Sequence, residues 1–291
     1  FSMKAWADVL THLNERSRKP RAVGVTMLID KCQGPHATAD LLDTVGEYID
    51  HWKLSFGTSA LLDEDLLRDK IAMVKEGNTL VYPGGTLTEY AIVRGKCREY
   101  LRRARDLGFD GVEISDGTIH LSASARRDAI QFSLDLGLTV VAEVGKKDPR
   151  QQPHAVELAE LALADFESGA SWVIVEARES GKGIGVFNAD GSVYERNVDI
   201  ITTALNSHLG QLIWEAPLKN QQEYFILRFG PDVSLGNIQP IDVLSLEALR
   251  AGLRFETLQP LVEQMEREGT TDIPTLADRI SRMARRKLPE V

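Results

Sequence analysis

The sequence predicts an α/β fold, namely a (β/α)₈ TIM barrel with additional C-terminal helices. Short runs of β-branched and apolar residues recur eight times along the 291 residues, and helix-like stretches separate most of these runs. No long linker rich in Pro, Gly or Ser interrupts the series. Strands that alternate with helices in this way form parallel βαβ units, and eight such units close most naturally into a barrel.

The expected strands are short apolar runs, whereas the expected helices repeat their apolar residues with the helical period. The strands are predicted at residues 24–31, 49–56, 79–85, 111–116, 139–145, 172–178, 212–217 and 232–238. Helical periodicity is clear at residues 91–107, 123–136 and 155–168.

The barrel is expected to be one domain with a helical piece at each end. We expect an N-terminal helix over residues 1–18, the catalytic barrel over 19–254, and a helical extension packed on the barrel over 255–291. Within the extension, residues 258–267 and 274–285 have the amphipathic pattern of two helices.

Composition and charge exclude several classes of function. The chain is 43% hydrophobic and 26% charged, as globular proteins are, and its net charge of −9 argues against binding to nucleic acid or to an anionic membrane. Cys32 and Cys97 are the only cysteines and form no metal or disulfide motif, which favours a reducing cytoplasm. The sequence contains no apolar run of transmembrane length, and it leaves open whether the chain forms a homo-oligomer.

Charged residues stand near the carboxyl ends of several otherwise apolar strands. Residues two apart in a strand share a face, which places Lys53 with Ser55 and Glu113 with Ser115. Buried charges must pair with one another, with a metal or with a charged ligand. A ring of ion pairs that only closes the barrel is one interpretation. An active site is favoured, because barrel enzymes keep theirs at this end of the strands. The glutamates at these late strand positions are Glu113, Glu143, Glu176 and Glu215.

Two glycine-rich stretches follow predicted strands. Residues 179–185 read ESGKGIG, in which Ser180, Gly181 and Lys182 offer a hydroxyl group, backbone N–H groups and an ammonium group to a phosphate. Taken alone, such a stretch is more often a flexible loop, and it matches neither the Walker nor the dinucleotide-binding fingerprint. Residues 82–86 would bring backbone close to a ligand, or would form a plain turn.

The histidines do not form a zinc site. The six are scattered at positions 12, 36, 51, 120, 154 and 208, without HxH or HExxH spacing. Clustered carboxylates without histidines favour a hard cation such as Mg²⁺.

Several motifs together resemble those of phosphosulfolactate synthases. They are residues 81–87 (VYPGGTL), 112–117 (VEISDG), 143–147 (EVGKK), 176–185 (EARESGKGIG) and 235–238 (LGNI). The resemblance extends from about residue 19 to residue 254 and implies a TIM barrel that uses Mg²⁺ to add sulfite to C3 of phosphoenolpyruvate. The product would be (2R)-3-phosphosulfolactate, a precursor of coenzyme M or of sulfolactate.

The resemblance also implies roles for individual residues. Lys147 corresponds to the acid that protonates C2 of the substrate, and a lysine among other cations would have a lowered pKa suited to that role. Two or three of the four glutamates would bind Mg²⁺. The residues expected to hold the anionic substrates are Lys31, Lys53, Lys146, Arg178 and Lys182.

Three departures from the family pattern keep other functions open. Residues 30–34 read DKCQG where the family has Asp-Lys-Gly, residues 53–58 read KLSFGT where Lys-Phe-Gly-Trp-Gly-Thr is common, and residues 254–257 read RFET where Arg-Gly-Asp-Thr is typical. Cys32, Ser55 and Phe56 thus suggest a relative that adds another nucleophile to phosphoenolpyruvate. A barrel without synthase activity, like the plant heat-stress relatives of the family, is the third hypothesis.

Overall fold

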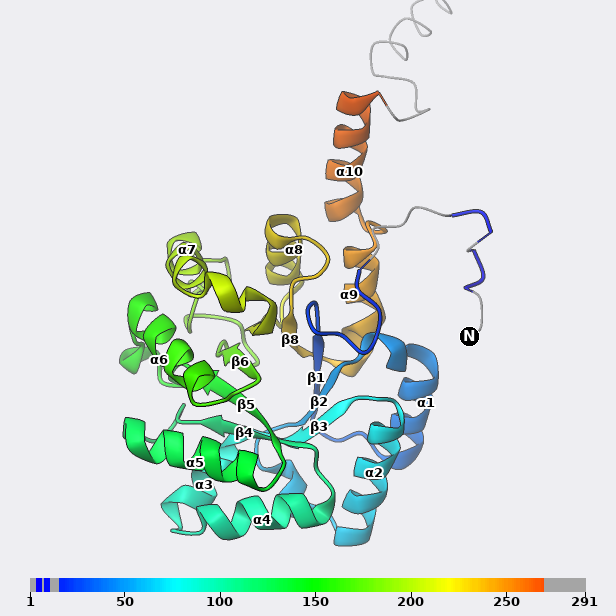
Figure 1. Ribbon diagram of the computed structural model, residues 1–291. Coiled ribbons are helices and arrows are strands. Elements are labelled where there is room, and N and C mark those ends of the chain that lie inside the picture. Colours follow the sequence, from blue (N-terminus) through cyan, green and yellow to red (C-terminus); the bar gives the residue numbers. More distant parts are fainter. Residues whose placement is uncertain (1–3, 7, 11–15, 270–291) are drawn as a thin grey trace, which may run out of the picture.

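A computed structural model describes residues 4–6, 8–10 and 16–269. The predicted barrel is confirmed: eight parallel strands occur in the order β3-β2-β1-β8-β7-β6-β5-β4, and helices surround them (Figure 1). All eight predicted strand positions hold a strand. The strands are β1 Thr26–Asp30, β2 His51–Leu54, β3 Leu80–Pro83, β4 Gly111–Ser115, β5 Thr139–Val144, β6 Trp172–Val175, β7 Leu212–Glu215 and β8 Leu235–Ile238.

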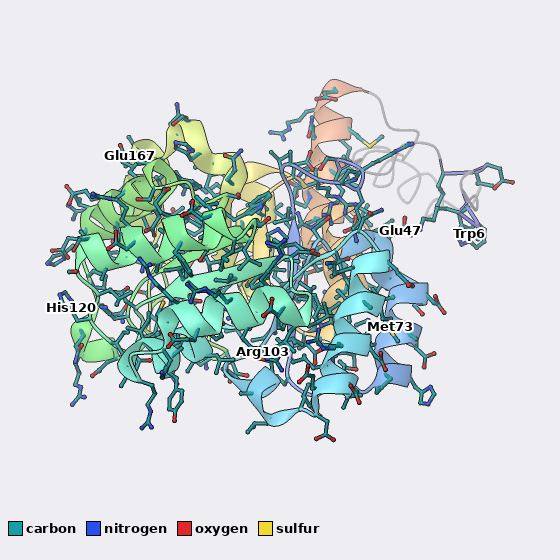
Figure 2. All side chains as sticks on the ribbon, turned by 60° about the horizontal axis from the view of Figure 1, so that its bottom comes forward. Trp6, Glu47, Met73, Arg103, His120 and Glu167 are labelled. Atoms are coloured by element: carbon teal, nitrogen blue, oxygen red, sulfur yellow. The ribbon has the colours of Figure 1, made fainter. Side chains whose placement is uncertain are left out.

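The helices follow the strands and cover the outside of the barrel. In chain order they are α1 Pro35–Val45, α2 Glu64–Glu76, α3 Gly85–Val93, α4 Cys97–Leu107, α5 Ala123–Asp135, α6 Ala155–Glu167, α7 Glu195–Ala204, α8 Lys219–Phe229, α9 Val243–Arg250 and α10 Phe255–Glu268. Polar side chains cover their outward faces, as Arg103 on α4 and Glu167 on α6 show (Figure 2). The periodicity argument was wrong in joining residues 91–107 into one helix, because Gly95 takes a φ of 66° and separates α3 from α4.

The structure describes only parts of the segments that flank the barrel at its N- and C-terminal ends. The described residues between 4 and 10 form turns rather than the expected N-terminal helix, and residues 1–3, 7 and 11–15 lie outside the described part. Helix α10 contains the predicted stretch 258–267, packs against α8 and α9, and projects beyond the barrel (Figure 1). The second expected helix, residues 274–285, lies outside the described residues.

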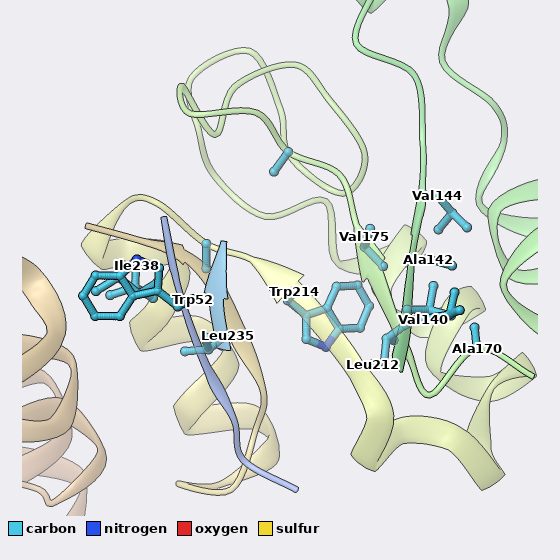
Figure 3. Packing of buried hydrophobic residues seen from close by; sticks show 14 of the residues in the cluster. Trp52, Val140, Ala142, Val144, Ala170, Val175, Leu212, Trp214, Leu235 and Ile238 are labelled. Atoms are coloured by element: carbon cyan, nitrogen blue, oxygen red, sulfur yellow. The ribbon is translucent and has the colours of Figure 1, made fainter. Parts of the chain in front are cut away.

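Apolar side chains fill two layers. The larger layer lies between strands and helices and includes Trp52, Trp214 and Leu235 (Figure 3). The smaller one lies inside the barrel, where Met27, Tyr82 and four other apolar residues, namely Val25, Val141, Ile174 and Ile213, pack together. This inner layer separates the two ends of the barrel, so charged groups at the carboxyl and amino ends form distinct clusters.

The amino end of the barrel, which we call the floor, is closed by buried basic residues. The carboxylate of Asp50 lies 3.0 Å from Arg21 Nη1 and 3.3 Å from Arg16 Nη2, and it accepts a hydrogen bond from the backbone N–H of Thr26. Lys19 donates to Thr79 Oγ1 at 2.7 Å, and Arg250 donates to the carbonyl of Val233 at 2.7 Å. These donors therefore bond to backbone and side-chain oxygens of the protein itself.

Candidate active site

Four glutamates and one lysine meet inside the carboxyl end of the barrel, which we call the mouth. Lys53 extends inward from β2, and its Nζ lies 2.8 Å from Glu113 Oε2, 3.0 Å from Glu143 Oε2 and 3.6 Å from Glu215 Oε1. These side chains are all less than a tenth exposed. The predicted gathering of charged strand ends around one mouth is thus confirmed, because alternate residues of β2, β4, β5 and β7 point inward.

Lys147 enters the same cluster from the loop after β5. Its Nζ lies 2.7 Å from Glu143 Oε1 and 2.5 Å from Glu176 Oε2. Gly117 allows this approach, because a Cβ atom there would lie only 2.8 Å from the lysine Nζ. The backbone N–H of Lys147 also donates to the carbonyl of Gly117, which fixes the loop beside β4.

The environment of Lys147 corrects one expectation. Burial lowers its pKa, but the carboxylates of Glu143 and Glu176 more than offset this, so that the pKa is raised above its ordinary value. The sequence argument placed Lys147 among cations and expected a lowered pKa. In the structure its nearest charges are anions, because Glu143 on β5 and Glu176, just after β6, both reach it.

The cluster contains more carboxyl groups than ammonium groups. Burial raises the pKa of Glu113 to about 8 even though Lys53 opposes the shift. The pKa of Glu176 is raised well above its usual range by burial and by the neighbouring Glu143 and Glu215. Burial opposes ionisation of Glu143 as well, but Lys147 and Lys53 both face it and hold its pKa well below the ordinary value. Glu113 and Glu176 therefore favour their protonated forms in the free site, and a bound cation would favour their ionised forms instead.

These groups line a cavity of about 580 Å³ at the mouth. Of the residues predicted from the sequence, those that line it are Lys53, Glu113, Glu143, Lys147, Glu176, Arg178, Ser180 and Glu215. The remaining predicted residues lie elsewhere. Lys31 forms an ion pair with Glu179 on the rim, and Lys146 donates to the carboxylate of Asp116 at 2.8 Å. Gly181 is buried with its carbonyl bonded to Gln221, and Lys182 is exposed outside the cavity.

Sequence reasoning missed several residues that shape the cavity. Asn237 lines it from the end of β8, and Thr118 lines it from the β4–α5 loop. The buried carboxylate of Glu89 accepts the backbone N–H of Thr118 at 2.8 Å and so holds that loop in place. Gly85 donates its N–H to Glu113 Oε1 at 2.8 Å, and a Cβ atom there would collide with the same oxygen. Gly85 and Asn237 belong to motifs quoted from the sequence, but they received no role there, whereas Thr118 and Glu89 lie outside those motifs.

The donor set suits a magnesium ion that is bound partly by substrate. Within the described ranges, no three carboxyl, imidazole or thiol groups converge as a complete metal cage would require. One buried oxygen at the cavity, Asn237 Oδ1, has no hydrogen-bond donor. Mg²⁺ commonly takes only one or two carboxylates and completes its shell with water and substrate oxygens. The surplus of carboxyl groups over ammonium groups and the unpaired oxygen of Asn237 fit such an ion.

Comparison with known proteins agrees with this site. The sequence model of the (2R)-phospho-3-sulfolactate synthase (ComA) family matches residues 14–256. The chain belongs to the phosphosulfolactate synthase family. Phosphosulfolactate synthases of Methanothermobacter thermautotrophicus and Methanocaldococcus jannaschii are 42% and 44% identical to it over 84% and 80% of this chain, covering 94% and 93% of their own lengths.

Two less similar proteins also match. The phosphosulfolactate synthase of Bacillus subtilis is 37% identical over 86% of this chain and 98% of its own length. Protein HEAT-STRESS-ASSOCIATED 32 of Arabidopsis thaliana is 23% identical over 81% of this chain and 88% of its own length. Among solved structures, the carboxyl transferase domain of Rhizobium etli pyruvate carboxylase has a TM-score of 0.52 at 12% identity, over 86% of this chain and 49% of that one, which supports the barrel fold alone.

The family consists of enzymes that act on small molecules. A cavity of about 580 Å³ at the mouth is consistent with a small-molecule substrate. The described residues include no helix that is both long and apolar enough to cross a membrane.

Proposed function

We propose that this protein adds sulfite to C3 of phosphoenolpyruvate, with Mg²⁺, to give (2R)-3-phosphosulfolactate. The observation that carries the proposal is the ammonium group of Lys147, which lies between Glu143 and Glu176 in the cavity of a phosphosulfolactate synthase family barrel. A proton donor there lies beside groups that can hold an anionic substrate, and proton transfer to carbon needs that proximity.

The reaction would form one C–S bond and one C–H bond without releasing phosphate. The sulfur lone pair attacks C3, and the C2–C3 π electrons move toward C2 and the carboxylate group. Lys147 Nζ then transfers a proton to C2 and regains one from solvent. Its raised pKa keeps the proton on the lysine in the free enzyme. If Glu143 or Glu176 turned toward a bound cation, the hold on Lys147 would weaken and the lysine would become a stronger acid.

Charge in the cavity supports a role for Mg²⁺. Two or three of Glu113, Glu143, Glu176 and Glu215 would hold it, and when bound it would stabilise the negative charge that develops on the substrate carboxylate. Arg178 and Ser180 also line the cavity and would donate to the phosphate group, and Lys53 forms ion pairs with the glutamates. These donors would let anionic substrates enter a protein of net charge −9.

A different nucleophile is the second candidate. Phe56 lines the cavity where a tryptophan is common in the family, and the hydroxyl group of the neighbouring Ser55 is buried without a hydrogen-bond partner. Cys32 lies outside this cavity, at a separate apolar pocket, and gives the second candidate no support.

One experiment separates these candidates. The purified protein would be incubated with phosphoenolpyruvate, Mg²⁺ and a panel of nucleophiles that includes sulfite and small thiols, and the products read by mass spectrometry. We expect phosphosulfolactate to form with sulfite and to disappear when EDTA removes the cation. A product with another nucleophile, and none with sulfite, would replace the first proposal by the second. Absence of any product would favour a barrel without synthase activity.

A further inference from the structure

Three of the residues around the cavity share an uncommon backbone conformation. Within residues 16–269, the non-glycine residues with positive φ are Phe56, Asn78, Arg178 and Asn237, at 57°, 51°, 59° and 57°. All but Asn78 line the mouth cavity. Non-glycine residues avoid this left-handed region unless the surroundings hold them there, and such residues concentrate at functional sites. Their grouping at the cavity indicates that neighbouring residues hold them in this conformation.

Arg178 is held at both ends of its own backbone. Its N–H donates to Glu176 Oε1 at 2.6 Å, and its carbonyl oxygen accepts a hydrogen bond from Asn237 Nδ2 at 3.3 Å. The guanidinium group adds one long contact, from Nη1 to the carbonyl of Lys147 at 3.4 Å. Arginine gains nothing from the left-handed region by itself, unlike asparagine, whose short side chain bonds locally. The conformation of Arg178 therefore depends on these partners.

Asn237 connects two segments that are far apart in the sequence. It stands at the end of β8, and its amide reaches across to the loop after β6. The side chain is 3% exposed, and its Oδ1 has no partner. The orientation of the amide follows from chemistry, because the carbonyl of Arg178 requires a donor and only Nδ2 can supply one.

We propose that Asn237 is a positioning residue that holds Arg178 over the cavity so that its guanidinium group can bind the phosphate group of the substrate. This inference rests on the proposed function, in which the cavity takes a phosphorylated carboxylate. Without Asn237, the Arg178 carbonyl loses its donor, the peptide unit turns toward ordinary φ values, and the guanidinium group moves away from the cavity.

The test compares the same substitution, asparagine to glycine, at two positions. Asn237→Gly removes the amide, and glycine accepts a φ of 57° without strain. Asn78→Gly is the matched control, because Asn78 has nearly the same conformation in the turn between α2 and β3, outside the cavity. We expect Asn237→Gly to raise KM for phosphoenolpyruvate about tenfold, the effect of one hydrogen bond to a charged group, and to change kcat by less than about threefold. Asn78→Gly should leave both constants as in the wild type.

A double-mutant cycle with Arg178→Ala shows whether Asn237 acts through the arginine. In the Arg178→Ala background, Asn237→Gly should have almost no further effect on KM, because the group that it positions is already gone. An undiminished effect there, an unchanged KM in the single variant, or an equal loss in Asn78→Gly would each overturn the inference.

Equilibrium binding separates this inference from the reaction itself. Calorimetry with phosphoenolpyruvate and Mg²⁺ should give a Kd that rises about tenfold in Asn237→Gly, whether or not sulfite is consumed. A wild-type protein that binds phosphoenolpyruvate but consumes no sulfite would refute the sulfite reaction and leave the inference supported by that Kd. A wild-type protein that binds no phosphoenolpyruvate would overturn the inference.

Discussion

The mouth and the floor of this barrel both contain buried ion pairs, but the two clusters are organised differently. At the floor, Asp50 forms ion pairs with Arg16 and Arg21 and accepts a hydrogen bond from a backbone N–H. The remaining basic groups donate mostly to backbone carbonyl oxygens. At the mouth, the carboxyl groups outnumber the lysines and face a cavity of about 580 Å³. Charged strand ends alone therefore do not identify a site. What distinguishes the mouth is a surplus of carboxyl groups that faces a cavity.

The comparison predicts that mouth residues affect turnover and floor residues affect stability. Lys147→Ala should lower kcat by about 10²–10⁴-fold, the usual contribution of a general acid. Lys146→Ala is the neighbouring control: Lys146 Nζ bonds to Asp116 rather than to the cavity, so its loss should reduce kcat far less. Steady-state kinetics, with circular dichroism to confirm folding, measures both. Normal sulfite consumption by Lys147→Ala would exclude the proposed role.

Asp50→Asn tests the floor. Its removal leaves the buried guanidinium groups of Arg16 and Arg21 short of negative charge, and breaking such a pair costs about 3–5 kcal/mol. We expect that loss in the free energy of unfolding, measured with urea, and a normal kcat for the folded fraction. A large fall in kcat at full folding would show that the two ends are not independent.

His51 links the floor to pH. Burial lowers its pKa from about 6.5 to about 4, so the folded protein keeps the ring neutral while the unfolded chain binds a proton. The contribution of His51 to the free energy of unfolding is fully present above pH 6.5. It decreases by about 3 kcal/mol as the pH falls from 6.5 to 4. In His51→Phe this part of the acid sensitivity should disappear. Urea unfolding at pH 7, 5 and 4 measures it, and parallel curves for variant and wild type would contradict the expectation.

Cation binding should give the smallest effect. In the presence of phosphoenolpyruvate, Mg²⁺ at ten times its Kd should add about 1.4 kcal/mol to the free energy of unfolding and raise Tm. Asp50→Asn should keep this shift in the free energy of unfolding. Glu143→Gln should lose most of it, because Glu143, unlike Asp50, lies at the mouth. Differential scanning calorimetry with and without EDTA provides the measurement. Equal shifts in all three proteins would place the cation elsewhere.

The sequence was sufficient for features that depend on local pattern. Apolar runs located every strand, and the alternation of side chains placed Lys53 and the four glutamates at one mouth. Features that depend on closure of the chain were not accessible. The floor joins Arg16 to Glu247 on α9, and the surroundings of Lys147 depend on which neighbouring strand reaches it first. Long side chains such as that of Lys146 can also turn to a nearer partner, which strand position does not reveal.

The meeting of β3 and β4 has a further consequence for motion. The strand ladder is continuous from β3 round to β4, and at the meeting point we find the hydrogen bond from Asp110 N–H to the Val81 carbonyl, at 3.3 Å. Lys53 on β2 and Glu113 on β4 bridge this seam from inside. Amide hydrogen exchange should therefore be fastest along the seam, and it should slow when ligands rigidify the mouth, so that breathing of the barrel reports directly on occupancy of the site.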